Sequence, residues 1–169
     1  KTPELYRREA PLVLTPHYRE LSRLVASDGV SDLGSAIEAA QRLLWAAGSD
    51  DFIVVAKGPV TAVAGVEKVL LPLSGPASLS TAGTGDVLSG ILAGTLALNH
   101  GYDGPWELLC SYAVSLHSLT GFIAAERYGE KSVIATDLID VIGDAMALAE
   151  EEALKGLGEG DISSGIKGA

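Results

Sequence analysis

The sequence predicts an α/β fold with a mostly parallel sheet. Three observations support this prediction: short apolar runs that end at proline or glycine, helical repeats of apolar side chains between and after these runs, and 47% hydrophobic residues in a chain of 169. A chain of this length and composition can bury a core of its own and is globular rather than disordered. Strands that alternate with helices favour parallel pairing.

A short strand and a short helix open the pattern. Residues 12–15 form an apolar run that ends at Pro16, which predicts a buried strand. Residues 18–25 follow as a helix, because apolar side chains recur at helical spacing and are expected to face the core: Leu21, Leu24 and Val25. The charged residues 1–11 show no strong period, and we expect only the end of a helix there.

A second helix and a central strand come next. Ser31 is expected to cap this helix, which ends at Gly48. Residues 52–56 are apolar and rich in β-branched side chains, which predicts a central parallel strand buried on both faces. Residues 60–64 and 68–73 then form a hairpin or a pair of shorter strands.

Three helices are expected in the second half of the chain. The first spans residues 86–98, and the second spans residues 106–128 with one apolar face: Leu109, Ala113, Leu116, Leu119 and Ile123. A Thr136 cap predicts the last helix over residues 137–154. Residues 155–169 are rich in glycine, and we expect a flexible tail.

Charge and composition exclude several classes of partner. The net charge is −10, from 12 basic and 22 acidic residues, and no basic run is present, so neither nucleic acid nor a membrane is an expected partner. The single cysteine, Cys110, is expected to be a buried free thiol, which fits a cytoplasmic, reducing location. His17, His100 and His117 show no metal-ligand spacing, so no metal site is predicted.

A glycine-rich turn before the helix at residues 86–98 is the strongest sign of a site. Gly83 and Gly85 can adopt positive φ angles and let the backbone approach a ligand. The free amides at the start of the helix, from Thr84, Gly85 and Asp86, favour an anion such as phosphate. Asp86 either caps the helix or acts on a substrate.

Two other segments are expected at the same edge of the sheet. His17 follows the strand at residues 12–15, and residues 57–61 follow the strand at 52–56. In α/β sheets, ligands bind beyond the carboxyl ends of the strands. We therefore expect His17, residues 57–61 and the turn at residues 83–86 to line one rim.

Three motifs resemble those of the NAD(P)H-hydrate dehydratase family, also called the YjeF C-terminal domain family, of the ribokinase-like superfamily. Residues 14–20 (LTPHYRE) resemble the family's L-T-P-H-x-x-E, residues 57–61 (KGPVT) its K-G-x-x-T, and residues 82–90 (AGTGDVLSG) its A-G-T-G-D-V-L-x-G. Histidine rather than asparagine at position 17 favours the dehydratases over related thiamine-pathway kinases. The resemblance runs from about residue 12 to residue 149.

The resemblance implies a three-layer α/β/α ribokinase-like fold and a repair reaction. Family enzymes use ATP or ADP, with Mg²⁺, to phosphorylate the hydroxyl of hydrated NADH or NADPH, and loss of phosphate restores the cofactor. Asp86 is then the catalytic base and contacts the substrate, and His17 contacts the hydrated dinucleotide. The implied nucleotide-binding residues are Lys57, Gly58, Pro59, Val60, Thr61, Gly83, Thr84 and Gly85.

The chain also departs from the family pattern. Family members carry further strands before the L-T-P-H motif, so residues 1–154 are expected to be part of a domain, completed by a partner or by a homo-oligomer. Tyr18 and Arg19 replace the usual Pro-Gly, and Ser118 and Phe122 replace the frequent Gly and Asp. Two alternatives stay open: a ribokinase-like kinase of a thiazole or pyrimidine precursor, and a non-catalytic nucleotide-binding fragment.

Overall fold

The computed structural model describes residues 11–27 and 29–163, and gives the side chains of these residues up to position 155. Most of the segment in which we expected the end of a helix, residues 1–11, therefore lies outside the described residues. The chain divides into two compact units. The first contains the residues up to Ser74 together with Leu88–Ser115, and the second contains Gly75–Val87 and the residues from Leu116 onward.

A four-stranded sheet forms the centre of the first unit. Its strands lie in chain order, β1 (Leu12–Leu14), β2 (Phe52–Ala56), β3 (Ala62–Ala64) and β4 (Val69–Leu70). β1 and β2 are parallel, whereas β2–β3 and β3–β4 are antiparallel. The expectation of a mostly parallel sheet is therefore wrong for these strands. The connections after β2 and β3 are too short for the crossover that parallel strands need.

β2 is the buried centre of this sheet. All five of its residues are buried, as predicted from their apolar character. β1 is only half-buried, because β2 is the one described strand that pairs with it. The predicted hairpin is confirmed as the antiparallel pair β3–β4.

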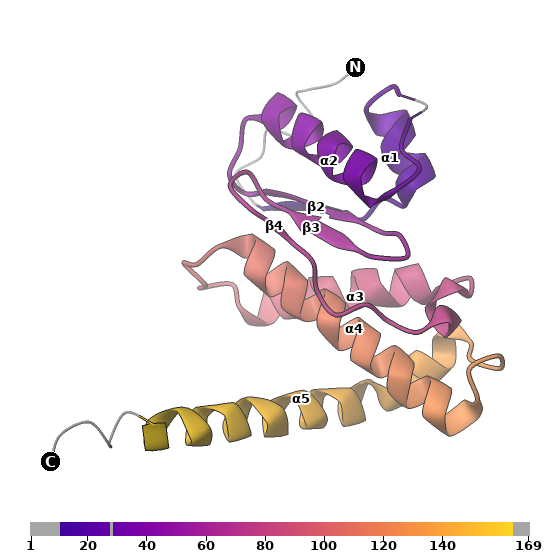
Figure 1. The fold of residues 1–169 in the computed structure, drawn as a ribbon, viewed down its shortest axis with the longest axis vertical. Coiled ribbons are helices and arrows are strands. Elements are labelled where there is room, and N and C mark those ends of the chain that lie inside the picture. Colours follow the sequence, from indigo (N-terminus) through magenta and orange to yellow (C-terminus); the bar gives the residue numbers. More distant parts are fainter. Residues whose placement is uncertain (1–10, 28, 164–169) are drawn as a thin grey trace, which may run out of the picture. The chain divides into compact units, whose positions relative to one another are not determined.

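Two helices cover one face of the sheet. In Figure 1, α1 (Tyr18–Leu24) and α2 (Leu33–Ala47) lie over the strands. They share a core with the sheet that includes Leu21, Ala40, Leu44, Phe52 and Val54. Leu24 is 41% exposed, so its predicted place in the core is wrong. Leu24 is the last residue of α1 and lines a pocket instead.

At the ends of α2, the local sequence predicted the C-terminal residue correctly but not the N-cap. Gly48 ends the helix with φ 63°, as predicted for a glycine in the left-handed region. The N-cap is Asp32, not Ser31. The Asp32 carboxylate accepts a hydrogen bond from the Ser35 amide at 2.9 Å, and the Ser35 hydroxyl accepts one from the Asp32 amide at 3.1 Å. The bond from the Ser35 amide, together with a bond that the Ser35 hydroxyl donates to the same carboxylate at 3.1 Å, lowers the pKa of Asp32.

α3 (Thr84–Leu98) and α4 (Trp106–Tyr128) are continuous helices. α3 begins two residues earlier than predicted, and α4 has the predicted bounds. The parts of both helices that belong to the first unit lie on the other face of its sheet (Figure 1). α4 is long and apolar enough to cross a membrane, but half of its most apolar window is buried inside the fold, as in a core helix of a soluble protein. Ala113 and Leu116 are buried, and Leu109, Leu119 and Ile123 are half-buried.

α5 (Ala135–Ser163) dominates the second unit. Its N-terminal half packs around a core that includes Ala124, Val133, Leu138 and Val141. Thr136 is inside the helix rather than its cap, and Asp137 instead reaches back to accept a hydrogen bond from the Ile134 amide at 2.9 Å. The helix continues to Ser163, which corrects the flexible tail expected from Lys155. Residues 164–169 lie outside the described part.

Candidate functional site

Two predicted segments meet at the carboxyl end of the parallel pair β1–β2. Beyond the strands, the Lys57 amide donates a hydrogen bond to the Pro16 carbonyl at 2.8 Å, and His17 and Lys57 form an isolated parallel bridge. The pairing of β1 and β2 thus continues into both loops. The structure confirms that His17 and the loop at residues 57–61 lie side by side.

Tyr18 fixes the conformation of the loop at residues 57–61. Its hydroxyl donates a hydrogen bond to the Val60 carbonyl at 3.3 Å, and its ring lies against Gly58. A Cβ atom at position 58 would clash with this ring, so the close approach requires glycine. Burial, with a smaller contribution from the charge of Asp32, raises the pKa of Tyr18 and keeps its hydroxyl protonated as a donor. Sequence reasoning treated Tyr18 only as a departure from the family pattern and missed this role.

His17 caps α1 through one ring nitrogen and lies close to the Glu20 carboxylate with the other. The His17 Nδ1 atom accepts a hydrogen bond from the Glu20 amide at 3.1 Å, and the Glu20 carboxylate accepts one from the His17 amide at 2.8 Å. Because Nδ1 is an acceptor, the neutral ring carries its proton on Nε2. The side chain is 51% exposed, and Nε2 lies 3.4 Å from Glu20 Oε1. A bound molecule that accepts a hydrogen bond from Nε2 therefore has to share this proton with Glu20 or displace its carboxylate.

A pocket of about 330 Å³ adjoins this loop. Its wall is largely apolar and includes one basic and one acidic side chain: Leu14, Thr15, Pro16, Glu20, Arg23 and Leu24. Thr15 also approaches α3, with its hydroxyl oxygen 3.5 Å from that of Ser89. The carboxyl end of β1 thus offers a hollow beside the predicted ligand-binding rim.

The glycine-rich turn of the second unit depends on the conformation of Gly83. Gly83 has φ 90°, which an L side chain rarely adopts. A Cβ atom at this position would also lie 3.0 Å from the Cβ atom of Ala135. Both observations explain why glycine stands here, directly before α3.

Two amides of this turn already have acceptors. The Thr84 amide donates to the Thr81 carbonyl at 3.3 Å, and the Asp86 amide donates to the Gly83 carbonyl at 3.0 Å. We expected the amides of Thr84, Gly85 and Asp86 to face an anion. A phosphate that binds the Thr84 or Asp86 amide therefore has to share it with these carbonyls or displace them.

Thr84 and His117 hold the turn from inside. Thr84 is buried, and its hydroxyl lies 2.6 Å from the Leu79 carbonyl and 2.8 Å from the Thr81 carbonyl. The Thr84 carbonyl in turn lies 3.0 Å from Nε2 of buried His117. Since a carbonyl only accepts, Nε2 of His117 carries the donated proton. The sequence showed His117 on the helix but gave no sign of this contact, because the two residues are 33 positions apart.

Asp86 lies in the first turn of α3 and is exposed. Its carboxylate makes no hydrogen bond or ion pair with the part of the chain that the structure describes. This arrangement leaves the carboxylate available to a substrate hydroxyl. Gly83, Thr84, Gly85 and Asp86 belong to the second unit, and their meeting with His17 and residues 57–61 at one rim stays a prediction.

Comparison with known proteins decides the family. The family model described as Carb_kinase, NAD(P)H-hydrate dehydratase, matches residues 1–144. The chain belongs to the NAD(P)H-hydrate dehydratase family. The predicted family is therefore confirmed, and the three motifs that indicated it lie inside the matched range.

Individual members of the dehydratase family agree with this assignment. The chain is 34% identical over 146 residues to the bifunctional NAD(P)H-hydrate repair enzyme Nnr of Thermofilum pendens, which covers 86% of the chain and 26% of that enzyme. The ADP/ATP-dependent NAD(P)H-hydrate dehydratase of Bacillus subtilis, co-crystallized with ATP/Mg²⁺ and soaked with CoA, superposes with a TM-score of 0.69 at 28% identity. A ribokinase-like superfamily protein of Enterococcus faecalis superposes with a TM-score of 0.64 at 25% identity over 86% of the chain and 48% of that protein.

These likenesses confirm the predicted ribokinase-like α/β fold. They also show that the chain corresponds to only part of its relatives. The match to the B. subtilis structure covers 83% of this chain and 50% of that one. The chain thus spans about a quarter of the bifunctional relative and half of the solved dehydratase.

Proposed function

We propose that this chain is the part of an ATP- or ADP-dependent NAD(P)H-hydrate dehydratase that binds the nucleotide and supplies the catalytic base. The observation that carries the proposal is the exposed, unpaired carboxylate of Asp86 at the start of α3, directly after a turn that needs a glycine with φ 90°. The role of general base for this carboxylate is inferred from the family assignment.

The loop at residues 57–61 is proposed to hold the nucleotide. Tyr18 and the Lys57–Pro16 hydrogen bond fix this loop before a ligand arrives, so little conformational entropy is lost on binding. Gly58 lets the Tyr18 ring pack directly on the loop and hold its backbone in place. The proposed nucleotide contacts are those of the family motif: Lys57, Gly58, Pro59, Val60, Thr61, Gly83, Thr84 and Gly85.

Asp86 is proposed to act as the general base. It takes the proton of the hydrate hydroxyl as the hydroxyl oxygen attacks the terminal phosphoryl group of ATP or ADP. Phosphate then leaves with its oxygen, and loss of a proton from the neighbouring ring carbon restores the double bond of the reduced nicotinamide. His17 is proposed to orient the hydrated dinucleotide through Nε2.

Mg²⁺ is proposed to arrive with the nucleotide. Mg²⁺ keeps several waters and binds mostly through substrate phosphates and one or two carboxylates. The described residues offer no group of three His, Cys, Asp or Glu side chains for the ion, so the phosphates of the nucleotide would hold it. The ion would neutralise charge on the transferred phosphoryl group.

A turnover assay of the protein that contains this chain tests the proposal. NADH hydrate, Mg²⁺ and either ATP or ADP are mixed with it, and the absorbance of the reduced nicotinamide is followed. We expect Asp86→Asn to lower kcat at least about 100-fold, the range of general-base catalysis, and to keep nucleotide affinity within about tenfold. Asp140→Asn, at an exposed carboxylate on α5, serves as the matched control. Unimpaired turnover of Asp86→Asn would remove Asp86 from the mechanism.

We also propose that the open edge of β1 is covered by a further strand, either from another part of the same protein or from a second copy. Among the described strands β1 pairs only with β2, and an unpaired edge invites association. Sedimentation of residues 1–169 is expected to show an oligomer, whereas a stable monomer would contradict a second copy. A cytoplasmic location is part of the same proposal, because Cys110 is a buried free thiol.

A further inference from the structure

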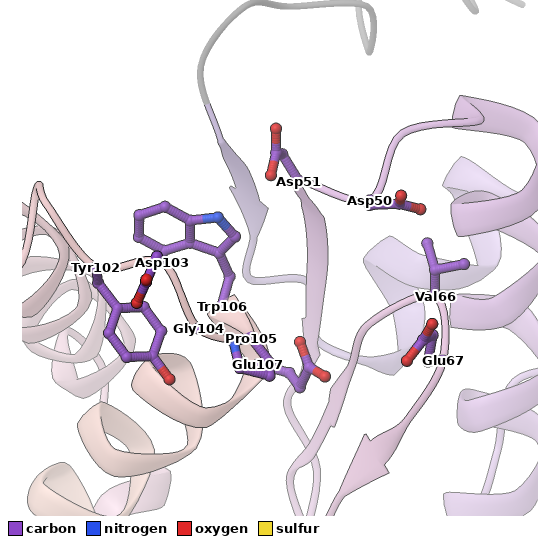
Figure 2. A pocket seen from close by; sticks show the side chains of 10 residues that line it. All are labelled: Asp50, Asp51, Val66, Glu67, Tyr102, Asp103, Gly104, Pro105, Trp106 and Glu107. Carbon is purple, nitrogen blue, oxygen red and sulfur yellow. The ribbon is translucent and has the colours of Figure 1, made fainter.

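A second pocket lies at the opposite end of β2 from the predicted nucleotide loop. It has a volume of about 380 Å³, at the lower end of the range for small-molecule sites. Three segments of the first unit form it (Figure 2): the turn before β2, the turn between β3 and β4, and the residues that lead into α4. No motif of the dehydratase family falls on these segments.

The lining of this pocket is strongly acidic. Five of its side chains are carboxylates, and none is basic: Asp50, Asp51, Glu67, Asp103 and Glu107. Anionic ligands are therefore excluded by repulsion, and a cation is favoured. Within the described part of the chain, no three His, Cys, Asp or Glu side chains are grouped in a way that could hold a metal ion. The carboxylates are thus spread around the pocket rather than gathered at one point.

Glu107 distinguishes this pocket from an ordinary acidic surface. It is only 8% exposed, and none of the residues that the structure describes gives its carboxylate a hydrogen bond or an ion pair. Figure 2 shows the carboxylate directed into the pocket, toward the side formed by Val66 and Glu67. The carboxylate oxygens stay accessible to solvent although most of the residue is buried, so a cation in the pocket can reach them.

The backbone around Glu107 makes room for it. A Cβ atom on Gly65 would lie 3.1 Å from Glu107 Oε2, so a larger residue at position 65 would crowd the carboxylate. Gly65 is buried at the end of β3. The position of this unpaired charge is therefore built into the sheet and into α4.

Aromatic and aliphatic groups line the space between the carboxylates. The rings of Tyr102 and Trp106 lie edge to face, with centroids 6.0 Å apart and planes at 70°. Val66, 38% exposed, adds an apolar surface. Aromatic faces attract organic cations, and methylene groups pack on such surfaces as the stems of lysine side chains do.

We propose that this pocket binds a linear aliphatic polyamine. One ammonium group pairs with Glu107 inside the pocket, and a second pairs with the carboxylates at the rim. The methylene chain between them packs against Trp106 and Val66. No three of these carboxylates gather around one point that a compact metal ion could occupy, whereas a chain of spaced ammonium groups matches their spread. This inference does not depend on the proposed dehydratase activity.

Fluorescence of Trp106 provides a direct test. The chain has two tryptophans, and Trp45 is 71% exposed on α2, so Trp45→Phe isolates the signal of Trp106. In this background, spermidine is titrated at constant ionic strength. Separate titrations use butylamine, tetramethylammonium and Mg²⁺. We expect saturable binding of spermidine, at least tenfold weaker binding of butylamine, and no saturation by the other two ions.

Two variants locate the site. Glu107→Gln is expected to weaken spermidine binding at least tenfold, and Glu38→Gln, at an exposed carboxylate on α2, is expected to leave it unchanged. Thermal unfolding without polyamine checks that Glu107→Gln folds. Asp103→Asn, at the exposed rim, gives an independent reading that does not depend on the folding of Glu107→Gln. Asp103→Asn is expected to weaken spermidine binding at least threefold.

Other outcomes would overturn the proposal. If Mg²⁺ saturates the signal as spermidine does, the pocket is a metal site. If Glu38→Gln and Glu107→Gln weaken spermidine binding equally, binding depends only on the net charge of the protein. Unchanged affinity in both Glu107→Gln and Asp103→Asn would place any bound polyamine elsewhere.

Discussion

Replacement of Gly83 by alanine tests the described geometry of the glycine-rich turn. Two costs follow from the structure. A left-handed backbone at φ 90° costs an L residue about 1–2 kcal/mol. The new Cβ atom would lie 3.0 Å from the Ala135 Cβ atom, closer than the optimum of about 3.5–4.0 Å, which adds about 1 kcal/mol. The lower entropy of the unfolded alanine chain returns about 0.5 kcal/mol.

The net expectation is a loss of about 2 kcal/mol in the free energy of unfolding, or roughly 4–8 °C in Tm for a chain of this size. Urea unfolding of Gly83→Ala and thermal unfolding measure the two quantities. Ala135→Gly separates the two costs, because the double variant relieves the contact with Ala135 and leaves the strained φ. We expect the double variant to recover about 1 kcal/mol relative to the sum of the single variants.

Gly90→Ala is the matched control on the same helix. A Cβ atom at position 90 meets open space and the residue is inside α3, so alanine should stabilise the protein by about 0.5–1 kcal/mol. If Gly83→Ala lowers the free energy of unfolding by less than about 0.5 kcal/mol, the argument from φ is refuted. If the change in the double variant equals the sum of the changes in the two single variants, the argument from the contact with Ala135 is refuted.

Two further predictions concern single side chains. His17→Asn should keep the cap of α1 and the free energy of unfolding, whereas His17→Ala should lower the free energy of unfolding by about 1 kcal/mol in urea. Both variants should raise KM for the hydrate. An unchanged KM would mean that His17 acts only as a helix cap. Burial raises the pKa of Cys110 to about 12, and the charge of Glu107 contributes. The contribution of the buried neutral Cys110 thiol to the free energy of unfolding is therefore fully present below the pKa of an unfolded thiol, about 8.5. This contribution is lost as the pH rises toward the pKa in the folded protein. Urea unfolding at about pH 8 and pH 10 should show a steeper loss for the parent than for Cys110→Ala, and equal slopes would contradict the shift.

The sequence predicted the elements whose signals are local. The apolar run of β2, the glycine that ends α2 and the bounds of α4 are all determined by residues inside or next to the element. Asp32 and Ser31 are neighbours with similar capping ability, and only the hydrogen bonds with Ser35 show which one caps α2. The expected parallel direction holds for β1–β2 but not for the pairings of β3 and β4, because the short connections after β2 and β3 leave no room for the crossover that parallel strands need.

The segments of the candidate site were predicted from the sequence, but the residues that hold these segments in place were not. His17, the loop at residues 57–61 and the turn at residues 83–86 were identified from motif and strand ends. Tyr18 and His117 were not assigned roles, because each acts through a carbonyl distant in the chain, 42 positions away for Tyr18. No role was assigned to Glu107 from the sequence, because its low exposure and its lack of a hydrogen-bond partner among the described residues are seen only in the structure.

The contact between Tyr18 and Gly58 has a consequence for how these positions change in evolution. A side chain at position 58 requires the Tyr18 ring to move or to be replaced. Changes at the two positions are therefore expected to be coupled. Loss of the tyrosine opens space at position 58, whereas replacement of Gly58 first displaces the ring and its hydrogen bond to the Val60 carbonyl.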